Sequence, residues 1–283
     1  MARLLLGGVA LAVAGALGAC ADDESDQLIS ALYSPSPGAS PAASPAAPPG
    51  TPGETAGGGS PPAEALDRQL TDSDELRAQR EELVERDIAR AVEDERIVTA
   101  FRDVPRHAFV PRDVLDRAYA DFALPIEHGQ TISQPSLVAM MTELVDVDPG
   151  ERVLEIGTGS GFQAAILREL TDEVYSVEIV PELSETARAV LEALGYGDIH
   201  LERRDGYLGW PEAAPFDAIV VTAAPDHLPR PLVDQLRDGG RMVIPIGPVG
   251  DVQTLWLVTK RGEEVDMQEV VPVRFVPLTR EEP

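Results

Sequence analysis

The sequence predicts an α/β fold: a doubly wound, mostly parallel sheet with helices before it and antiparallel edge strands after it. Two observations lead to this prediction. Between residues 152 and 246, short apolar runs typical of buried strands alternate with helical patterns. A glycine-rich turn also joins the first of these strands to the next helix, which places free backbone N–H groups beside a bound ligand.

The composition narrows the classes of function. With 283 residues, 43% of them hydrophobic, the chain can bury one sizeable core. Its formal net charge of −26 argues against a nucleic-acid partner, because phosphate backbones are bound by clustered Lys and Arg. The single cysteine, Cys20, excludes an intramolecular disulfide and a Cys-based metal site. We expect no metal, since the four histidines show no ligand spacing: His107, His128, His200 and His227.

Residues 1–20 resemble the signal peptide of a bacterial lipoprotein. Met1-Ala2-Arg3 is a short positive start, and the apolar run 4–17 is too short to span a bilayer comfortably. The run ends in Leu17-Gly18-Ala19-Cys20, so we expect Cys20 to be lipidated and to anchor the protein in the bacterial cell envelope, on its periplasmic or outer face. The alternative is an ordinary signal peptide or an uncleaved hydrophobic tail. A downstream start would instead give a cytoplasmic protein.

Residues 21–70 are rich in Pro, Ala, Gly and Ser, with almost no bulky apolar groups after Tyr33. Such a segment cannot bury enough surface to offset the entropy lost on ordering. We therefore expect a disordered tether, stiffened by its prolines, in front of a folded domain at residues 71–283.

The folded part begins with a helical pattern at residues 70–101. Its apolar residues recur on one face: Leu76, Leu83, Ile88, Val92, Ile97 and Phe101. Pro105 and Pro111 then interrupt the helix, and a short helical piece follows at residues 114–119. Residues 124–135 form a loop that is unusually polar for a mere connector, and a helix follows it.

The glycine turn comes directly after the strand at residues 152–156. Its sequence, Gly157-Thr158-Gly159-Ser160-Gly161, has the spacing G-x-G-x-G. A dinucleotide site would need G-x-G-x-x-G, and a phosphate loop would need a Lys-Ser/Thr pair after its last glycine. The turn therefore favours a nucleoside without a pyrophosphate, and S-adenosylmethionine is the leading candidate. A tight structural turn is the alternative interpretation.

Acidic residues follow two later strands. Glu178 ends the strand at residues 174–178, about twenty residues beyond the glycines, where an acid can accept both ribose hydroxyls of a nucleoside. A helix cap or a solvated side chain is the alternative for Glu178. Asp205 follows the strand at residues 199–203 and could receive the adenine amino group. The remaining elements are strands at 216–225 and 241–246, a helix at 232–236, and edge strands at 253–258 and 270–278.

Several blocks of the chain resemble the protein-L-isoaspartate O-methyltransferase family, a class I S-adenosylmethionine-dependent group with a Rossmann-like sheet. The blocks begin at Val104-Pro105-Arg106-His107, Gln130-Thr131-Ile132-Ser133-Gln134-Pro135, Leu154-Glu155-Ile156-Gly157, Pro215-Phe216-Asp217-Ala218-Ile219 and Val273-Arg274-Phe275-Val276-Pro277-Leu278. The resemblance runs from about residue 80 to residue 278. Arg204 departs from the family, which commonly has a glycine before the Asp-Gly pair.

The resemblance assigns roles to individual residues. It implies that Ser133 is the active-site residue and that Thr131 and Ile132 bind the substrate beside it. It implies a cofactor site made of Glu155, Gly157, Thr158, Gly159, Gly161, Glu178, Asp205, Gly206 and, by a looser match, Gln253. An alternative for Ser133 is a helix N-cap, which the following Gln-Pro pair also fits.

The activity implied is methyl transfer from S-adenosylmethionine to the α-carboxyl group of L-isoaspartyl residues in damaged proteins and peptides. The sequence does not give the oligomeric state, and a monomer is the default expectation. A carboxylate is ionised at neutral pH, so no strong general base is required, and no His/Asp or Cys/His pair converges on the motifs. Two alternatives stay open. One is a methyltransferase for another carboxylate or a small molecule, and the other is a non-catalytic, envelope-bound binding module.

Overall fold

The computed structural model describes residues 70–280. The predicted signal peptide with Cys20 and all but the last residue of the predicted tether lie outside the described residues. Within residues 70–280, no helix combines the length and the apolar character that a membrane span needs.

The N-terminal helices form a broken series rather than one long helix. They are α3 (Asp74–Leu83), the π-helical turn η1 (Val84–Ile88), α4 (Ala89–Ala91) and α5 (Glu95–Asp103). The single helical pattern expected at residues 70–101 is interrupted because Val92 is extended and the Asp94 carboxylate then caps α5, accepting from Arg96 N at 2.8 Å. An N-cap residue starts a new helix by satisfying a free backbone donor.

The segment before the sheet contains short elements. Two 3-10 helices, η2 (Arg106–Phe109) and η3 (Arg112–Arg117), precede β1 (Leu124–Pro125), the turn η4 (Glu127–Gly129) and β2 (Thr131–Ile132). β1 and β2 pair antiparallel, so the polar loop expected here contains a small hairpin. Helix α6 (Pro135–Val145) follows it directly.

The sheet has seven strands in the order β5-β4-β3-β6-β7-β8-β9. The strands are β3 (Arg152–Ile156), β4 (Glu173–Glu178), β5 (His200–Arg203), β6 (Phe216–Val221), β7 (Leu236–Ile246), β8 (Gln253–Arg261) and β9 (Glu264–Val273). β3 to β7 are parallel, and β8 runs antiparallel to both of its neighbours. The predicted fold class is therefore confirmed.

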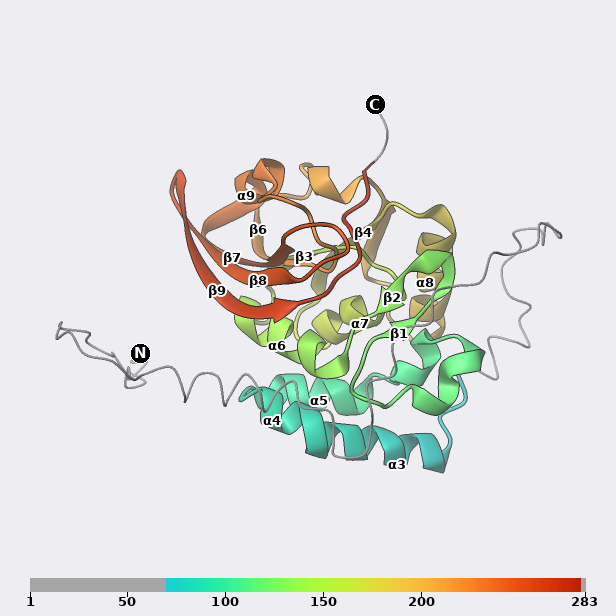
Figure 1. Ribbon diagram of the computed structural model, residues 1–283. Coiled ribbons are helices and arrows are strands. Elements are labelled where there is room, and N and C mark those ends of the chain that lie inside the picture. The colour runs from blue at the N-terminus through green and yellow to red at the C-terminus, as the bar shows by residue number, and fades with distance from the viewer. Residues whose placement is uncertain (1–69, 281–283) are drawn as a thin grey trace. The chain divides into compact units, whose positions relative to one another are not determined.

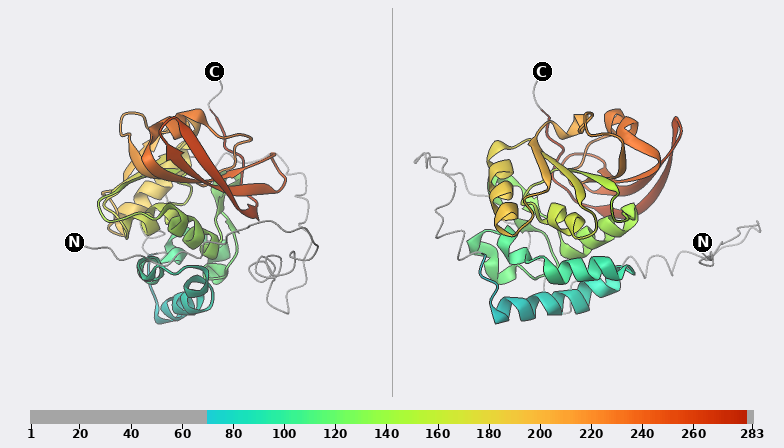
Figure 2. Two further views of the ribbon diagram at one scale, coloured as in Figure 1. Left: turned by 90° about the vertical axis from the view of Figure 1, so that its left-hand side faces the viewer. Right: turned by 180° about the vertical axis from the view of Figure 1, so that it is seen from behind.

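Helices cover both faces of this sheet. α7 (Phe162–Arg168) and α8 (Pro181–Ala193) join α6 on one face, and α9 (Arg230–Gln235) covers the other (Figure 1). Alternate residues of β3 supply the two cores, since Val153 faces the first layer while Leu154 and Ile156 face the second. The N-terminal helices pack against the outer side of the α6–α7 layer (Figure 2).

The strand order reverses at β3. The chain runs outward from β3 through β4 to β5, and then returns to β6 on the other side of β3. Loops that leave the carboxyl ends of β3 and β6 therefore diverge and leave a crevice, which is where doubly wound sheets bind their ligands.

The last strand ends earlier than the sequence suggested, because β9 stops at Val273 and does not continue to Leu278. Two residues further on, Phe275 N donates to the side-chain oxygen of Gln253 at 2.9 Å. Beyond it, Val276 O accepts from Ala224 N at 2.8 Å and Leu278 N donates to Ala224 O at 2.9 Å. Residues 276–279, here called the covering segment, thus leave the sheet edge and join the loop after β6.

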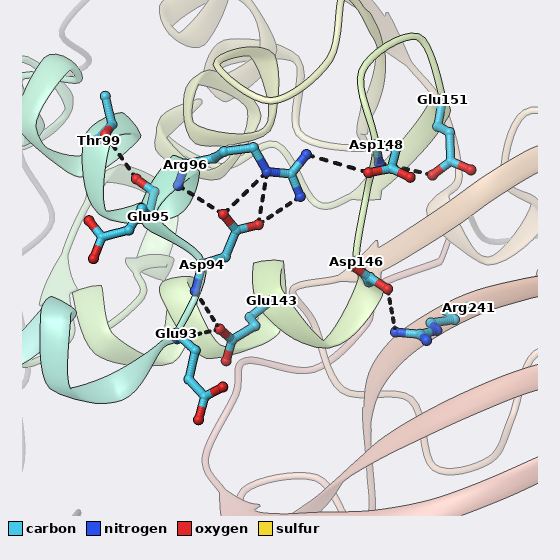
Figure 3. Close-up of polar contacts among 10 residues, drawn as sticks. All are labelled: Glu93, Asp94, Glu95, Arg96, Thr99, Glu143, Asp146, Asp148, Glu151 and Arg241. Atoms are coloured by element: carbon cyan, nitrogen blue, oxygen red, sulfur yellow. Dashed lines mark hydrogen bonds and ion pairs between the residues drawn. The ribbon is translucent and has the colours of Figure 1, made fainter. Parts of the chain in front are cut away.

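Paired charges fasten the N-terminal helices to the sheet at the amino end of β3 (Figure 3). The Glu143 carboxylate of α6 accepts from the backbone N–H of Asp94 at 3.0 Å. Arg96 pairs with Asp94 at 2.7 Å and lies 3.6 Å from Asp148 in the turn before β3. These acidic side chains bond to neighbouring groups, so the negative charges in this region help to hold the helices against the sheet.

Candidate active site

A pocket lies at the carboxyl ends of the parallel strands. Its empty volume is about 550 Å³, including space open to solvent. Its walls come from the loop before α6, from the ends of β3, β4 and β6, from the start of the 3-10 helix η5 (Gly206–Leu208) and from the covering segment. The residues are Gln130, Thr131, Ile156, Gly157, Gly159, Val177, Glu178, Ile179, Val180, Gly206, Thr222, Ala223, Val276, Pro277, Leu278 and Thr279.

The glycine turn brings bare backbone to the pocket. Gly157 has φ +94°, and a Cβ atom there would lie 2.6 Å from Oγ1 of Thr222. That hydroxyl donates to the carbonyls of Ile156 and Gly157, at 2.9 and 2.7 Å, so it is not free to move away. Gly161 has a different role: a Cβ there would lie 3.2 Å from Leu191 of α8, so its lack of a side chain lets α7 and α8 pack closely. Gly161 does not line the pocket.

Glu178 is fixed at the tip of β4 and is only 6% exposed. One carboxylate oxygen accepts from the N–H groups of Ile179 and Val180, at 2.9 and 3.0 Å, and the other accepts from Gly159 N at 2.8 Å. The side chain therefore joins the glycine turn to the end of the neighbouring strand. It lines the pocket, as an acid expected to face a ribose must.

Asp205 is a helix cap in this structure. One carboxylate oxygen accepts from Tyr207 N at 3.0 Å at the start of η5, and the other lies 3.6 Å from Nε of Arg280. Gly206, the next residue, lines the pocket, whereas Asp205 itself is set back from it. Arg204, the departure from the family pattern, pairs with Glu202 and Glu212 at 2.6 and 2.7 Å and leaves the turn intact.

Glu155 lies beneath the glycine turn and is fully buried. It accepts a hydrogen bond from the hydroxyl of Ser176, which also bonds to the hydroxyl of Thr158 at 2.6 Å. Burial raises the pKa of Glu155 to about 8, and the charge of Glu178 adds to the rise. Neither Glu155 nor Thr158 lines the pocket, so the structure gives both a supporting place below the turn.

The loop that carries Ser133 lies beside the pocket. Thr131 lines it, while Ile132 is 3% exposed and pairs with Leu124 across the hairpin. Ser133 is half-buried, and its hydroxyl makes no hydrogen bond to any other residue in the described range. The cap alternative is wrong for this structure, because α6 has Gln134 at its N-cap and no side-chain cap bond there.

Gln253 lies at the start of β8 and does not line the pocket. Its side-chain nitrogen donates to the carbonyls of Pro248 and Asp251, at 3.0 and 2.8 Å, while its oxygen accepts from Phe275 N. The amide is only 2% exposed and its bonding capacity is used within the protein. The structure thus places Gln253 behind the covering segment, which it holds.

Sequence reasoning missed the covering segment and the residues after β6. Thr222 and Ala223 could have been found by the rule that gave Glu178, since they also follow a parallel strand at its carboxyl end. The covering segment overlaps the family block at residues 273–278, but that block gave no indication of a place in the pocket. Its residues read as a strand, and only the hydrogen bonds to Ala224 reveal their place.

Comparison with known proteins identifies the family. The model of the protein-L-isoaspartate(D-aspartate) O-methyltransferase family matches residues 78–283, well over half of the chain. A protein-L-isoaspartate O-methyltransferase of Opitutus terrae is 56% identical over 206 residues, which cover 72% of this chain and 88% of the relative. The chain belongs to the protein-L-isoaspartate O-methyltransferase family.

Solved structures of protein-L-isoaspartate O-methyltransferases agree with this. One has a TM-score of 0.64 and 32% identity, over 70% of this chain and 65% of its own. A beta-aspartate methyltransferase structure from Plasmodium falciparum, in complex with S-adenosyl-L-homocysteine, has a TM-score of 0.61 and 24% identity, over 73% and 99% of the two chains. The second likeness shows the fold alone. The family resemblance read from the sequence blocks is confirmed.

Proposed function

We propose that this chain is a repair enzyme that methylates the α-carboxylate of L-isoaspartyl residues in damaged proteins and peptides, with S-adenosylmethionine as donor. The proposed reaction rests on membership of the protein-L-isoaspartate O-methyltransferase family. The observation that carries the site is the pocket at the strand tips, with a bare glycine turn and a fixed acid in its wall. The methyl ester then closes spontaneously to a succinimide, as the following backbone amide nitrogen attacks the ester carbonyl and methanol leaves, and hydrolysis of the succinimide returns some normal aspartate.

The pocket wall fits an adenosyl donor. Gly157 leaves room for close approach to the backbone, and the carboxylate of Glu178 keeps lone pairs that two ribose hydroxyls can use. Ile156, Val177 and Leu278 supply an apolar surface for a base. When bound, the donor supplies an electrophilic methyl group on a sulfonium. Its positive charge and the negative charge of the incoming carboxylate cancel in the products.

The protein's part in the reaction is alignment. A carboxylate is already a nucleophile at neutral pH, so no residue needs to remove a proton from it. Well-oriented reactants can gain roughly 7–11 kcal/mol over free solution. Ser133, whose hydroxyl lacks a partner in the described part of the chain, is free to donate to the substrate carboxylate beside Thr131. Within residues 70–280 no basic side chain hydrogen-bonds to it, so nothing in that range would activate it as a covalent nucleophile.

A peptide assay tests this function. Purified protein should transfer labelled methyl from S-adenosylmethionine to a peptide that contains L-isoaspartate, and not to the same peptide with normal aspartate. Methylation of both peptides, or only of a small acid, would support the alternative methyltransferase. Calorimetry that finds donor binding without any transfer would support a binding module, and absence of donor binding would overturn the whole proposal.

We further propose that the enzyme is a monomer anchored to the cell envelope through a lipidated Cys20. The positive start, the apolar run and the Leu17-Gly18-Ala19-Cys20 ending support the anchor. Mass spectrometry of the native N-terminus should find lipid on Cys20, and Cys20→Ala should release the protein from membranes. An unmodified N-terminus in the cytoplasmic fraction would contradict the anchor. Light scattering on protein cleaved before residue 70 should give the mass of one chain.

A further inference from the structure

The carboxylate of Asp121 is the centre of the contacts that hold the loop around Ser133. It accepts from the backbone N–H of Ser136 at 2.8 Å, from the Ser136 hydroxyl at 2.8 Å and from Nε2 of Gln134 at 2.9 Å. Asp121 belongs to the turn between η3 and β1, well before this loop in sequence. Ser133 therefore lies next to Gln134, whose side chain is hydrogen-bonded to a carboxylate from another segment.

These bonds occupy the N-terminus of α6. Pro135 has no N–H, Ser136 N binds Asp121, and the next two amides bond to Gln134 O at 3.1 and 3.0 Å. The first turn therefore has no donor left for a substrate carboxylate. A hydroxyl donor for that carboxylate must come from the loop itself, where the hydroxyls of Thr131 and Ser133 have no internal partner in the described range and Ser133 is the one beside Gln134.

A buried cation, Arg106, bonds to the segment just before Asp121. Arg106 is 1% exposed, and its Nε donates to Ala118 O at 2.9 Å, three residues before Asp121. Its two terminal nitrogens are buried without a hydrogen-bond partner. Burial lowers the pKa of Arg106 to about 9, while the charge of Asp121 opposes that fall. Its guanidinium also lies 4.9 Å from the ring centre of Phe162, the first residue after the glycine turn.

We propose that Asp121 is a positioning residue for methyl transfer: it fixes residues 134–136 so that the Ser133 hydroxyl meets the reacting carboxylate. The inference rests on the proposed function. The cofactor side is held separately, by the bonds of the Glu178 carboxylate to Gly159 N and to the amides of Ile179 and Val180. Loss of Asp121 should thus disturb the substrate and leave the donor in place.

The first test is Asp121→Asn. The asparagine oxygen can still accept from Ser136 N, but its NH₂ group faces the NH₂ group of Gln134, so that contact survives only if the Gln134 amide turns over, and the negative charge that all three donors share is lost. We expect kcat/KM for an isoaspartyl peptide to fall 10- to 100-fold, mainly in kcat, with the Kd for S-adenosylhomocysteine unchanged within about twofold. Asp113→Asn, an exposed carboxylate in η3, is the matched control and should keep wild-type kinetics.

The decisive test reverses the polarity of one bond. In Asp121→Asn/Gln134→Glu, the new amide can donate to the new carboxylate, so the lost contact is rebuilt with its donor and acceptor exchanged. We expect this double variant to regain most of the lost kcat, which a general loss of folding would not allow. Gln134→Glu alone should be impaired, because it places two carboxylates together.

Three results would overturn the inference. They are wild-type kinetics in Asp121→Asn, an equal loss of S-adenosylhomocysteine affinity and activity in that variant, and a double variant no better than either single one. Each of these requires an active wild-type enzyme. If the wild-type protein transfers no methyl group, the proposed function has failed and the role of Asp121 is not at issue.

Discussion

Glu178 accepts a hydrogen bond from Gly159 across 2.8 Å, so the acid expected to face the ribose also holds the glycine turn in shape. One side chain thereby links two walls of the pocket. The relationship means that changes at Glu178 act on the turn as well as on the ligand.

Glu178→Gln should weaken binding of the cofactor product. A hydrogen bond to a charged group contributes about 1.5–3 kcal/mol, so the Kd for S-adenosylhomocysteine should rise about 10- to 100-fold. Calorimetric titration measures it. Glu182→Gln, an exposed acid in the first turn of α8, is the control and should bind normally. Equal affinities for the two variants would contradict a ligand role for Glu178.

Gly157→Ala should abolish cofactor binding and lower stability by about 1–3 kcal/mol, because alanine at positive φ is strained and its Cβ would meet Thr222. Gly150 also has positive φ, at +82°, but has open space around its Cβ position and lies outside the pocket. Gly150→Ala should therefore show a stability loss without an affinity loss. If both variants bind S-adenosylhomocysteine equally well, the close approach at Gly157 is unimportant.

Glu155→Gln should change how stability depends on pH. The folded protein raises the pKa of Glu155 from 4.5 to about 8, so it binds this proton more tightly than the unfolded chain does. The resulting stability is complete below about pH 4.5 and is lost as the pH rises to 8. Urea unfolding should show the variant gaining on the wild type between pH 5 and pH 9, by a few kcal/mol in order of magnitude. Parallel pH profiles would contradict a titrating Glu155.

Gln253→Ala should loosen the covering segment. It removes the acceptor of Phe275 N and leaves buried polar groups unpaired, at a cost of about 1–3 kcal/mol each. S-adenosylhomocysteine should dissociate faster in stopped-flow measurements, although Gln253 does not line the pocket. Gln268→Ala, at an exposed site in β9, should leave the off-rate unchanged.

Ser133→Ala should lower kcat on an isoaspartyl peptide without changing the affinity for S-adenosylhomocysteine. The loss should exceed the 0.5–1.5 kcal/mol or so of an ordinary neutral hydrogen bond if the bond strengthens in the transition state. Full activity in this variant would remove Ser133 from the mechanism and leave the backbone of the loop to orient the substrate.

Much of the fold follows from local patterns. The parallel strands and their helices were readable because buried strands of a doubly wound sheet are short, apolar and separated by turn residues. The spacing of the glycines identified the turn, and its position at the end of a strand identified Glu178 as a candidate ligand residue. These features depend on residues that are close together in the sequence.

The remainder depends on partners that are distant in sequence. Residues 270–278 looked like one strand. Nothing near Gln253 in the sequence shows that its side chain would bond Phe275 N, just beyond the end of β9. The place of Asp205 as a cap, and of Glu155 below the turn, also came only from the fold. No sequence motif marks Asp121, because the residues to which it bonds lie thirteen and fifteen positions away.

The covering segment makes the binding pocket depend on residues that lie beyond the last strand of the sheet. Residues 276–279 follow every strand of the sheet in sequence, so a chain shortened to Val273 keeps all the strands and still lacks one wall of its binding pocket. Such a chain should have little affinity for the cofactor. Proteases that trim this end would inactivate an otherwise folded molecule.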